Sequence, residues 1–224
     1  MSRRHTTQPD SEPKMHNTRT WDLDESRILS RRELAAVLVD ALVRADRSTN
    51  VRRNLVVVRL ACCAGLRVSE IAALRMDDVV VGVSRPHLRL RRETTKGQYP
   101  RTVPLWWDAG TLADLTAWKE ERTAQGATDR DPFVCSVQAH RRGKALQRHA
   151  IRRRFLSACK VLGRPRLAAL TIHHGRHTFI SHALAGGRTL AEVRAAAGHS
   201  NVAVTSAYLH LVVDDAETIG SLFG

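Results

Sequence analysis

This sequence of 224 residues lacks the features of a membrane or secreted protein. No apolar run approaches the roughly 20 residues that a membrane-spanning helix needs. The N-terminus carries Arg and His but has no apolar signal core. Nor does any Cys-x-x-Cys pair occur, since the cysteines are Cys62, Cys63, Cys135 and Cys159. We therefore expect buried free thiols in a reducing compartment.

Acidic residues are absent from Pro132 to Ala191, whereas the whole chain has a formal net charge of +14. The basic residues of this stretch are Arg141, Arg142, Lys144, Arg148, Arg152, Arg153, Arg154, Lys160, Arg164, Arg166, Arg176 and Arg188. An ordinary solvated surface mixes both signs, so one sign over this length predicts contact with the phosphate backbone of a nucleic acid. The candidate DNA-binding residues are Arg141, Arg142, Lys144, Arg148, Arg152 and Arg153. We expect a cytoplasmic protein associated with the nucleoid and no membrane contact.

The hydrophobic patterns predict an α+β fold that is mainly helical. Residues 1–28 are polar, with five Lys or Arg and five Asp or Glu, and predict a flexible arm without net charge. Ser30, followed three residues later by Glu33, predicts a capping box at the start of a helix. A second helix, apolar on most sides and therefore buried, is expected over residues 51–64, with Gly65 capping its end.

In the middle of the chain the pattern changes to the alternation typical of strands. Strands are expected at residues 79–81, 87–91 and 101–105, with Lys96 and Gly97 in the turn before the last of them. They predict a small antiparallel sheet inside the helical protein. Further helices are expected near residues 69–74, 108–122, 146–162, 174–186, 189–197 and 202–212, and a short apolar insert at 133–135 lies in a loop.

Several short motifs combine cationic side chains with a tyrosine. They are Gly65-Leu66-Arg67-Val68-Ser69-Glu70, Thr95-Lys96-Gly97, His173-x-x-Arg176-His177, Gly198-His199-Ser200, Thr205 and Tyr208. Two guanidinium groups, Arg67 and Arg176, can grip a phosphodiester in forked geometry and stay charged at any relevant pH. A phenol such as that of Tyr208 needs cationic neighbours to become a good nucleophile. The residue types together predict attack on a phosphodiester without a metal.

In this order, the motifs resemble the catalytic domain of the tyrosine recombinases, also called phage-type integrases. The resemblance covers about residues 29–212, so it implies an N-terminal arm, a catalytic domain of that extent and a C-terminal tail at 213–224. It implies a site-specific recombinase or integrase that cleaves and rejoins DNA through a 3′-phosphotyrosine. Bond energy is kept in that intermediate, so neither ATP nor a metal is expected as a cofactor. A homotetramer on DNA is the expected assembly.

The motifs also suggest a role for each residue. The candidate catalytic residues are Arg67, Lys96, His173, Arg176, His199 and Tyr208. By the resemblance, Tyr208 is the nucleophile and Lys96 protonates the departing 5′ oxygen. From its place on the helix face of Arg176, His173 is expected to position the nucleophile or move a proton, and His199 to donate to the phosphate. Glu70 is expected to hold Arg67, and His177 to bond locally or cap a helix start.

The chain departs from the family pattern at Gly175 and Ala197, where leucine is usual; we expect changes in packing and intact chemistry. Most relatives carry a helical DNA clamp before this domain, whereas only about 28 residues precede it here. Two interpretations stay open: a short, inversion-type member, or a fragment that needs an accessory DNA-binding partner. The tail is equally open to docking on a neighbouring protomer or folding back on its own core.

Three other functions would use part of the same residues. A zinc site at His173 and His177 lacks the glutamate of the protease signature, because His174 stands in its place. A type IB topoisomerase would use much the same residues. Only the size of the domain and the recombinase-like sequences of the motifs favour a recombinase. A DNA-binding regulator built on a recombinase-like domain would not need Tyr208.

Overall fold

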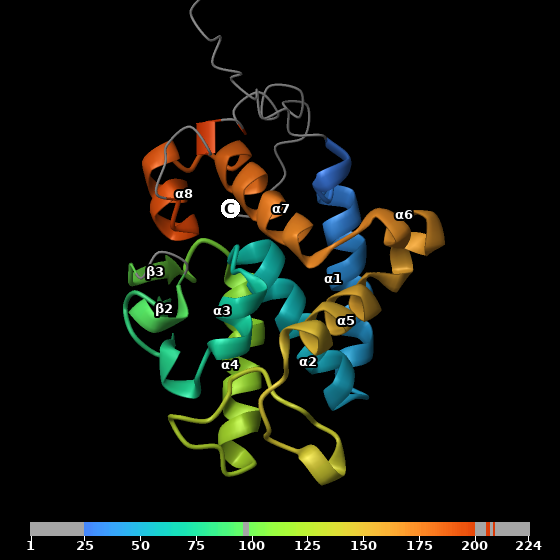
Figure 1. Cartoon of the computed structure of the whole chain (residues 1–224), viewed down its shortest axis with the longest axis vertical. Helices are drawn as coiled ribbons and strands as arrows, with labels where there is room; N and C mark the ends of the chain where they lie inside the picture. The colour runs from blue at the N-terminus through green and yellow to red at the C-terminus, as the bar shows by residue number, and fades with distance from the viewer. Residues whose placement is uncertain (1–24, 96–98, 200–204, 207, 209–224) are drawn as a thin grey trace, which may run out of the picture.

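The computed structural model describes residues 25–95, 99–199, 205, 206 and 208 (Figure 1). Its elements in chain order are η1 Glu25–Arg27, α1 Arg31–Ala45, α2 Thr49–Val58, η2 Arg59–Cys63, α3 Val68–Ala73, η3 Met76–Asp78, β1 Val79–Val80, β2 His87–Leu90, η4 Arg92–Thr94, β3 Arg101–Pro104, α4 Ala109–Ala124, η5 Ala139–Arg141, α5 Arg148–Ala158, η6 Cys159–Leu162, α6 Gly163–Ala169, α7 Ile172–Ala185 and α8 Leu190–Ala197. The fold is mainly helical with one small sheet, as predicted. Within the described residues, no helix has both the length and the apolar character needed to cross a membrane.

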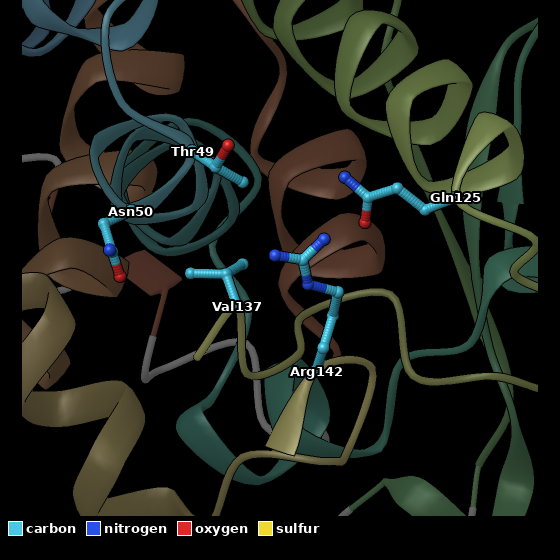
Figure 2. A pocket seen from close by; sticks show the side chains of 5 residues that line it. All are labelled: Thr49, Asn50, Gln125, Val137 and Arg142. Carbon is cyan, nitrogen blue, oxygen red and sulfur yellow. The ribbon is translucent and has the colours of Figure 1, made fainter. Parts of the chain in front are cut away.

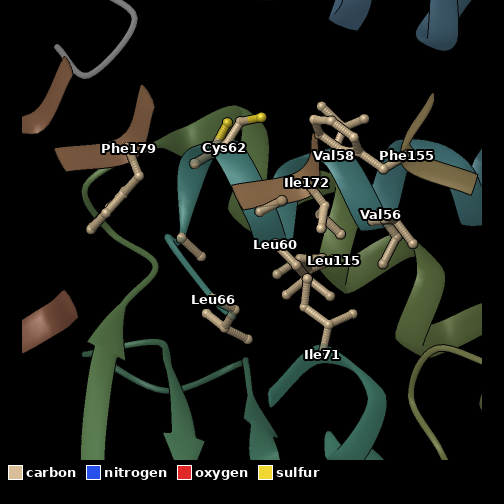
Figure 3. Packing of buried hydrophobic residues seen from close by; sticks show 14 of the residues in the cluster. Val56, Val58, Leu60, Cys62, Leu66, Ile71, Leu115, Phe155, Ile172 and Phe179 are labelled. Atoms are coloured by element: carbon tan, nitrogen blue, oxygen red, sulfur yellow. The ribbon is translucent and has the colours of Figure 1, made fainter. Parts of the chain in front are cut away.

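The α2 helix and the η2 π-helix that continues it form the centre of the core (Figure 3). Val56, Val58, Leu60 and Cys62 have no exposed surface, which confirms the prediction of a helix buried on most sides. The last turn is wider than expected, because the Ala64 amide bonds to the carbonyl five residues earlier at 3.0 Å. This wide turn ends directly before the first arginine motif.

The sheet is antiparallel, with strand order β1-β2-β3. In the β2–β3 register, Leu88 faces Val103 and Leu90 faces Arg101. Leu88 and Leu90 are buried while Arg89 between them is exposed, so the predicted alternation is confirmed. In Figure 1 the sheet lies beside α3, with α8 next to β3, so that two motif-bearing segments meet at one side of the molecule.

Local sequence rules are followed at the start of α1. Ser30 Oγ accepts from the Glu33 amide at 3.1 Å, and Glu33 Oε2 accepts from the Ser30 amide at 2.9 Å. This is the predicted capping box. Arg166 Nε also donates to Glu33 Oε1 at 2.7 Å, and this ion pair connects α1 to α6. Residues 1–24 of the predicted arm lie outside the described part of the chain; residues 25–27 form the short helix η1.

The segment between α4 and α5 is held by its apolar insert. Trp118 on α4 is fully buried and its Nε1–H donates to the Phe133 carbonyl at 2.8 Å. Phe133, Val134 and Cys135 are buried, which confirms the expected burial of the Cys135 thiol. Among the described residues, the structure adds one α-helix that the sequence did not predict, α6, which contains Pro165 in its first turn. Proline is tolerated there because the first amides of a helix have no intrahelical partner.

Candidate active site

The first arginine, Arg67, stands at the N-cap of α3, where Glu70 holds it. Glu70 Oε2 accepts from the Arg67 amide at 2.8 Å, and Oε1 accepts from Arg67 Nη1 at 3.1 Å. The Glu70 side chain is completely buried, whereas the Arg67 side chain is 21% exposed. The predicted contact between the two residues is therefore present, and it leaves part of the guanidinium open to solvent.

A second arginine that sequence reasoning missed, Arg101, completes the environment of Glu70. Its Nη1 and Nη2 donate to the two oxygens of Glu70 at 2.8 and 2.9 Å, and its Nε donates to the Ala196 carbonyl at 2.8 Å. Burial opposes ionisation of Glu70, yet the hydrogen bonds from Arg101 and Arg67 hold its pKa below the ordinary value. The available signal was strand alternation: Arg101 shares a strand face with the buried Val103 and so requires an acidic partner.

Arg176 links two of the motifs through backbone carbonyls. Its Nη1 donates to Gly65 O at 2.7 Å and its Nη2 donates to Ala197 O at 2.5 Å. The residue is 7% exposed. Burial and the nearby Arg67 guanidinium lower the pKa of Arg176 to about 9, so the group remains charged at neutral pH. The charge of Arg176 is therefore held between the Gly65 turn, which precedes Arg67, and the C-terminal end of α8, which precedes Gly198.

Glycine is required at the turn before Arg67. Gly65 has a φ of 65°, and a Cβ there would lie 2.3 Å from Cδ1 of Phe179 on α7. The departure at Gly175 has a similar physical reason: its Cβ would lie 2.9 Å from the Cβ of Ala61 in η2. The expected change in packing is confirmed at this position, because no larger side chain fits between α7 and η2.

His199 follows the left-handed Gly198, whose φ is 66°. A Cβ on Gly198 would lie 2.8 Å from Arg101 Cδ, so the turn packs on the arginine that holds Glu70. His199 Nδ1 lies 2.9 Å from the Thr205 hydroxyl. Burial, Arg176 and Arg67 lower the pKa of His199 to about 3, so its ring is neutral at neutral pH. Because the His199 ring is neutral and its Nδ1 is bonded to Thr205, its other nitrogen, Nε2, is left for a different partner.

Tyr208 is only 3% exposed, and its phenol oxygen is hydrogen-bonded to Nδ1 of His177. The two rings stack with centroids 5.9 Å apart at 25°. The expected role of His177, a local bond or a helix cap, was wrong: its partner is 31 residues away, and His174 forms the cap with Thr171. Burial raises the pKa of Tyr208 to about 12, although Arg176 acts in the opposite direction.

His173 lies at the start of α7 and is exposed. Burial of part of its ring and the charges of Arg152 and Arg176 lower its pKa. His173 and Arg176 are three residues apart on α7, as the predicted helical spacing requires, and α5 contacts α7 at the edge of the site. The contact with the Tyr208 phenol is made by His177 and not by His173. Lys96 lies outside the described residues.

The six candidate DNA-binding residues are all exposed, and they divide into two groups. Arg148, Arg152 and Arg153 lie on α5, which packs against α3 and α7. Arg141, Arg142 and Lys144 belong to the loop between α4 and α5, which Figure 1 shows at the end of the molecule opposite α8. Only the α5 group borders the candidate site.

Arg142 itself lines a cavity of about 250 Å³ with Thr49, Asn50, Gln125 and Val137. Figure 2 shows its guanidinium directed between Thr49 and Gln125. None of the described catalytic candidates lines this cavity. Among all the residues that the structure describes, no group of three His, Cys, Asp or Glu side chains is arranged to hold a metal. His177 Nδ1, one half of the zinc pair considered above, is bonded to Tyr208.

Known proteins match this chain over most of its length. The sequence model of the Phage integrase family matches residues 33–214. A tyrosine recombinase XerC of Corynebacterium efficiens is 30% identical over 167 residues, which are 75% of this chain and 49% of the relative. A XerC of Mycobacterium sp. (strain KMS) is 32% identical over 195 residues, 82% of this chain and 61% of the relative. The chain thus spans about half to three fifths of the length of these curated relatives.

Solved structures share the fold. The XerA recombinase aligns with a TM-score of 0.65 at 21% identity, over 96% of this chain and 68% of that one. The XerH recombinase bound to a palindromic difH substrate, in a post-cleavage complex, gives 0.62 at 21%, over 86% and 52%. A lambda integrase dimer bound to a COC′ core site gives 0.57 at 17%, over 81% and 47%. With the family match over residues 33–214, the conclusion is that this chain belongs to the Phage integrase family.

Proposed function

We propose that this chain is the catalytic domain of a site-specific DNA recombinase that cleaves and rejoins strands through a 3′-phosphotyrosine. The observation that carries the proposal is the position of Arg176. Its guanidinium joins the turn before Arg67 to the turn before His199, and its charge acts on the Tyr208 phenol. A phosphate gripped by the two arginines would thus lie beside both the histidine and the nucleophile.

Each residue has a defined task in the proposed reaction. The Tyr208 oxygen forms a bond to the scissile phosphorus while the bond to the 5′ oxygen breaks. Arg67 and Arg176 stabilise the negative charge that grows on the non-bridging oxygens. His199, fixed at Nδ1 by Thr205, donates from Nε2 to the same phosphate. Lys96 gives a proton to the departing 5′ oxygen.

The proposed partner is double-stranded DNA, and the proposed assembly is a homotetramer with or without an accessory DNA-binding protein. The exposed basic face of α5 supports DNA as the partner. Arg152 on this face lies close enough to the site for its charge to lower the pKa of His173. Two structural neighbours, XerH and lambda integrase, were solved on DNA sites. We place the catalytic unit at residues 29–212 and a tail at 213–224.

The test uses a pool of nicked DNA duplexes of randomised sequence, because the target site is unknown. The strand that would become attached is labelled at its 5′ end, and the reaction is run in chelator. A labelled covalent protein band that disappears in Tyr208→Phe supports the proposal. DNA binding without a covalent band from the wild type would reject it in favour of a DNA-binding regulator.

A further inference from the structure

The contact between His177 and Tyr208 has no role in the reaction described so far. His177 Nδ1 meets the phenol oxygen that is the proposed nucleophile, and the two rings are stacked. Of the imidazoles at the described site, His199 is bonded to Thr205 and His173 is exposed without a contact to the phenol. The buried phenol therefore has one nitrogen beside it that can take a proton.

Protonation states define the direction of this hydrogen bond. Burial and the neighbouring His174, Arg176, Arg27 and His173 lower the pKa of His177 to about 4. The imidazole is thus neutral at neutral pH, whereas the Tyr208 phenol, with its pKa raised to about 12 by burial, is protonated. The phenol O–H must donate and Nδ1 must accept, which places the imidazole proton on Nε2.

We propose that His177 is a catalytic residue that accepts the Tyr208 proton as the phenol oxygen attacks the phosphodiester. The inference rests on the function proposed above and adds the group that activates its nucleophile. The O–H bond of Tyr208 breaks and an N–H bond forms at Nδ1, while the oxygen–phosphorus bond forms. In rejoining, the 5′ hydroxyl attacks, the phenolate leaves, and the imidazolium returns the proton.

Bound DNA supplies the change in electrostatics that the transfer needs. The groups that face His177 are His173, His174 and Arg176 from α7, Arg27 from η1, His199 after α8, and Tyr208. None of these groups is an acid, so in the free protein none of them stabilises an imidazolium at His177. A phosphate placed against Arg176 brings negative charge among them, which raises the pKa of the imidazole. Proton transfer is thereby favoured when substrate is present.

The experiment measures the rate of covalent adduct formation against pH, with the nicked, randomised duplex pool as the probe. His177→Phe keeps a stackable ring and removes the accepting nitrogen; its folding is checked by its melting temperature. We expect the rate at neutral pH to fall by about 10²–10⁴-fold. The variant rate should rise about tenfold per pH unit as phenolate forms, while the wild-type rate levels off. A variant with the wild-type rate and profile overturns the proposal.

Two comparisons separate proton transfer from simple positioning. His177→Gln keeps a hydrogen-bond acceptor that cannot be protonated, so full activity in this variant would overturn the proposal. His174→Asn, one turn earlier on α7, keeps a cap acceptor for Thr171. Because His174 lowers the pKa of His177, this variant should keep the neutral-pH rate and a profile that levels off, with the levelling displaced only toward higher pH. Absence of any adduct from the wild type would reject the proposed function and, with it, this step. An adduct that forms equally well in His177→Phe would reject this step alone.

A further measurement on the protein without DNA reports the hydrogen bond itself. Nitrogen NMR of the His177 imidazole should show the proton on Nε2 and an accepting Nδ1 at neutral pH. In Tyr208→Phe the Nδ1 resonance should shift, because its donor is gone. A proton on Nδ1 would contradict the proposed direction of transfer.

Discussion

Removal of the Arg101 side chain should destabilise the fold strongly. Arg101→Ala leaves Glu70, whose side chain is 0% exposed, with only the single side-chain donor of Arg67. Loss of one partner from a buried pair costs about 3–5 kcal/mol, because the other charge stays buried without compensation. For a domain of this size, that corresponds to a melting temperature lower by about 6–20 °C. Urea unfolding of both proteins measures the difference, and a loss below about 1 kcal/mol would refute this reasoning.

The same variant should have a different dependence on pH. In the wild type the pKa of Glu70 is lowered from 4.5, so its contribution to stability is present above that value and lost as pH falls through the folded pKa. Without Arg101, burial is the largest remaining effect and the pKa should rise above 4.5. The buried Glu70 carboxylate then destabilises the variant above this raised pKa. The destabilisation disappears as pH falls and Glu70 becomes protonated. The stability difference between the proteins should therefore shrink toward acid pH.

A second substitution supplies the control for this reasoning. In Arg101→Ala with Glu70→Gln, no unpaired charge remains in the core, so part of the lost stability should return. A double variant no more stable than Arg101→Ala would show that the loss comes from packing of the arginine stem and not from the buried charge.

Three further predictions follow from contacts of the site. Gly175→Leu, which restores the residue usual in the family, should destabilise the protein by about 1–3 kcal/mol in urea unfolding, because α7 has no room for a side chain against η2; unchanged stability would contradict the packing explanation. Thr205→Val should slow adduct formation by up to about tenfold, since it removes the hydroxyl bonded to His199. Arg152→Ala should raise the pKa of His173 in an NMR titration, and no change would show that α5 does not border the site.

Features set by neighbours in the chain could be predicted from the sequence. The capping box of Ser30 and Glu33, the buried face of β2, and the left-handed Gly65 all depend on residues within a few positions of one another. The bond between Glu70 and Arg67 is of the same kind, since they are three residues apart at the start of α3. The candidate site was found because these local motifs occur in a recognisable order.

Contacts between distant segments could not be predicted. Arg101 and Glu70 are separated by 31 residues, and so are His177 and Tyr208. A strand pattern indicates that Arg101 faces inward, but which acid it meets depends on how β3 packs against α3 and α8. His177 follows Arg176 in the chain and reaches Tyr208 only because α7 passes beside that tyrosine.

The central claim is that Tyr208 becomes covalently attached to DNA. The most direct test forms the adduct on the nicked, randomised duplex pool, digests both the protein and the DNA, and locates the nucleotide by mass spectrometry. The account predicts a 3′-phosphate linkage on the peptide that contains Tyr208, and no adduct in Tyr208→Phe. A linkage to Tyr99, a serine or any other residue, or an adduct that persists in Tyr208→Phe, would contradict it.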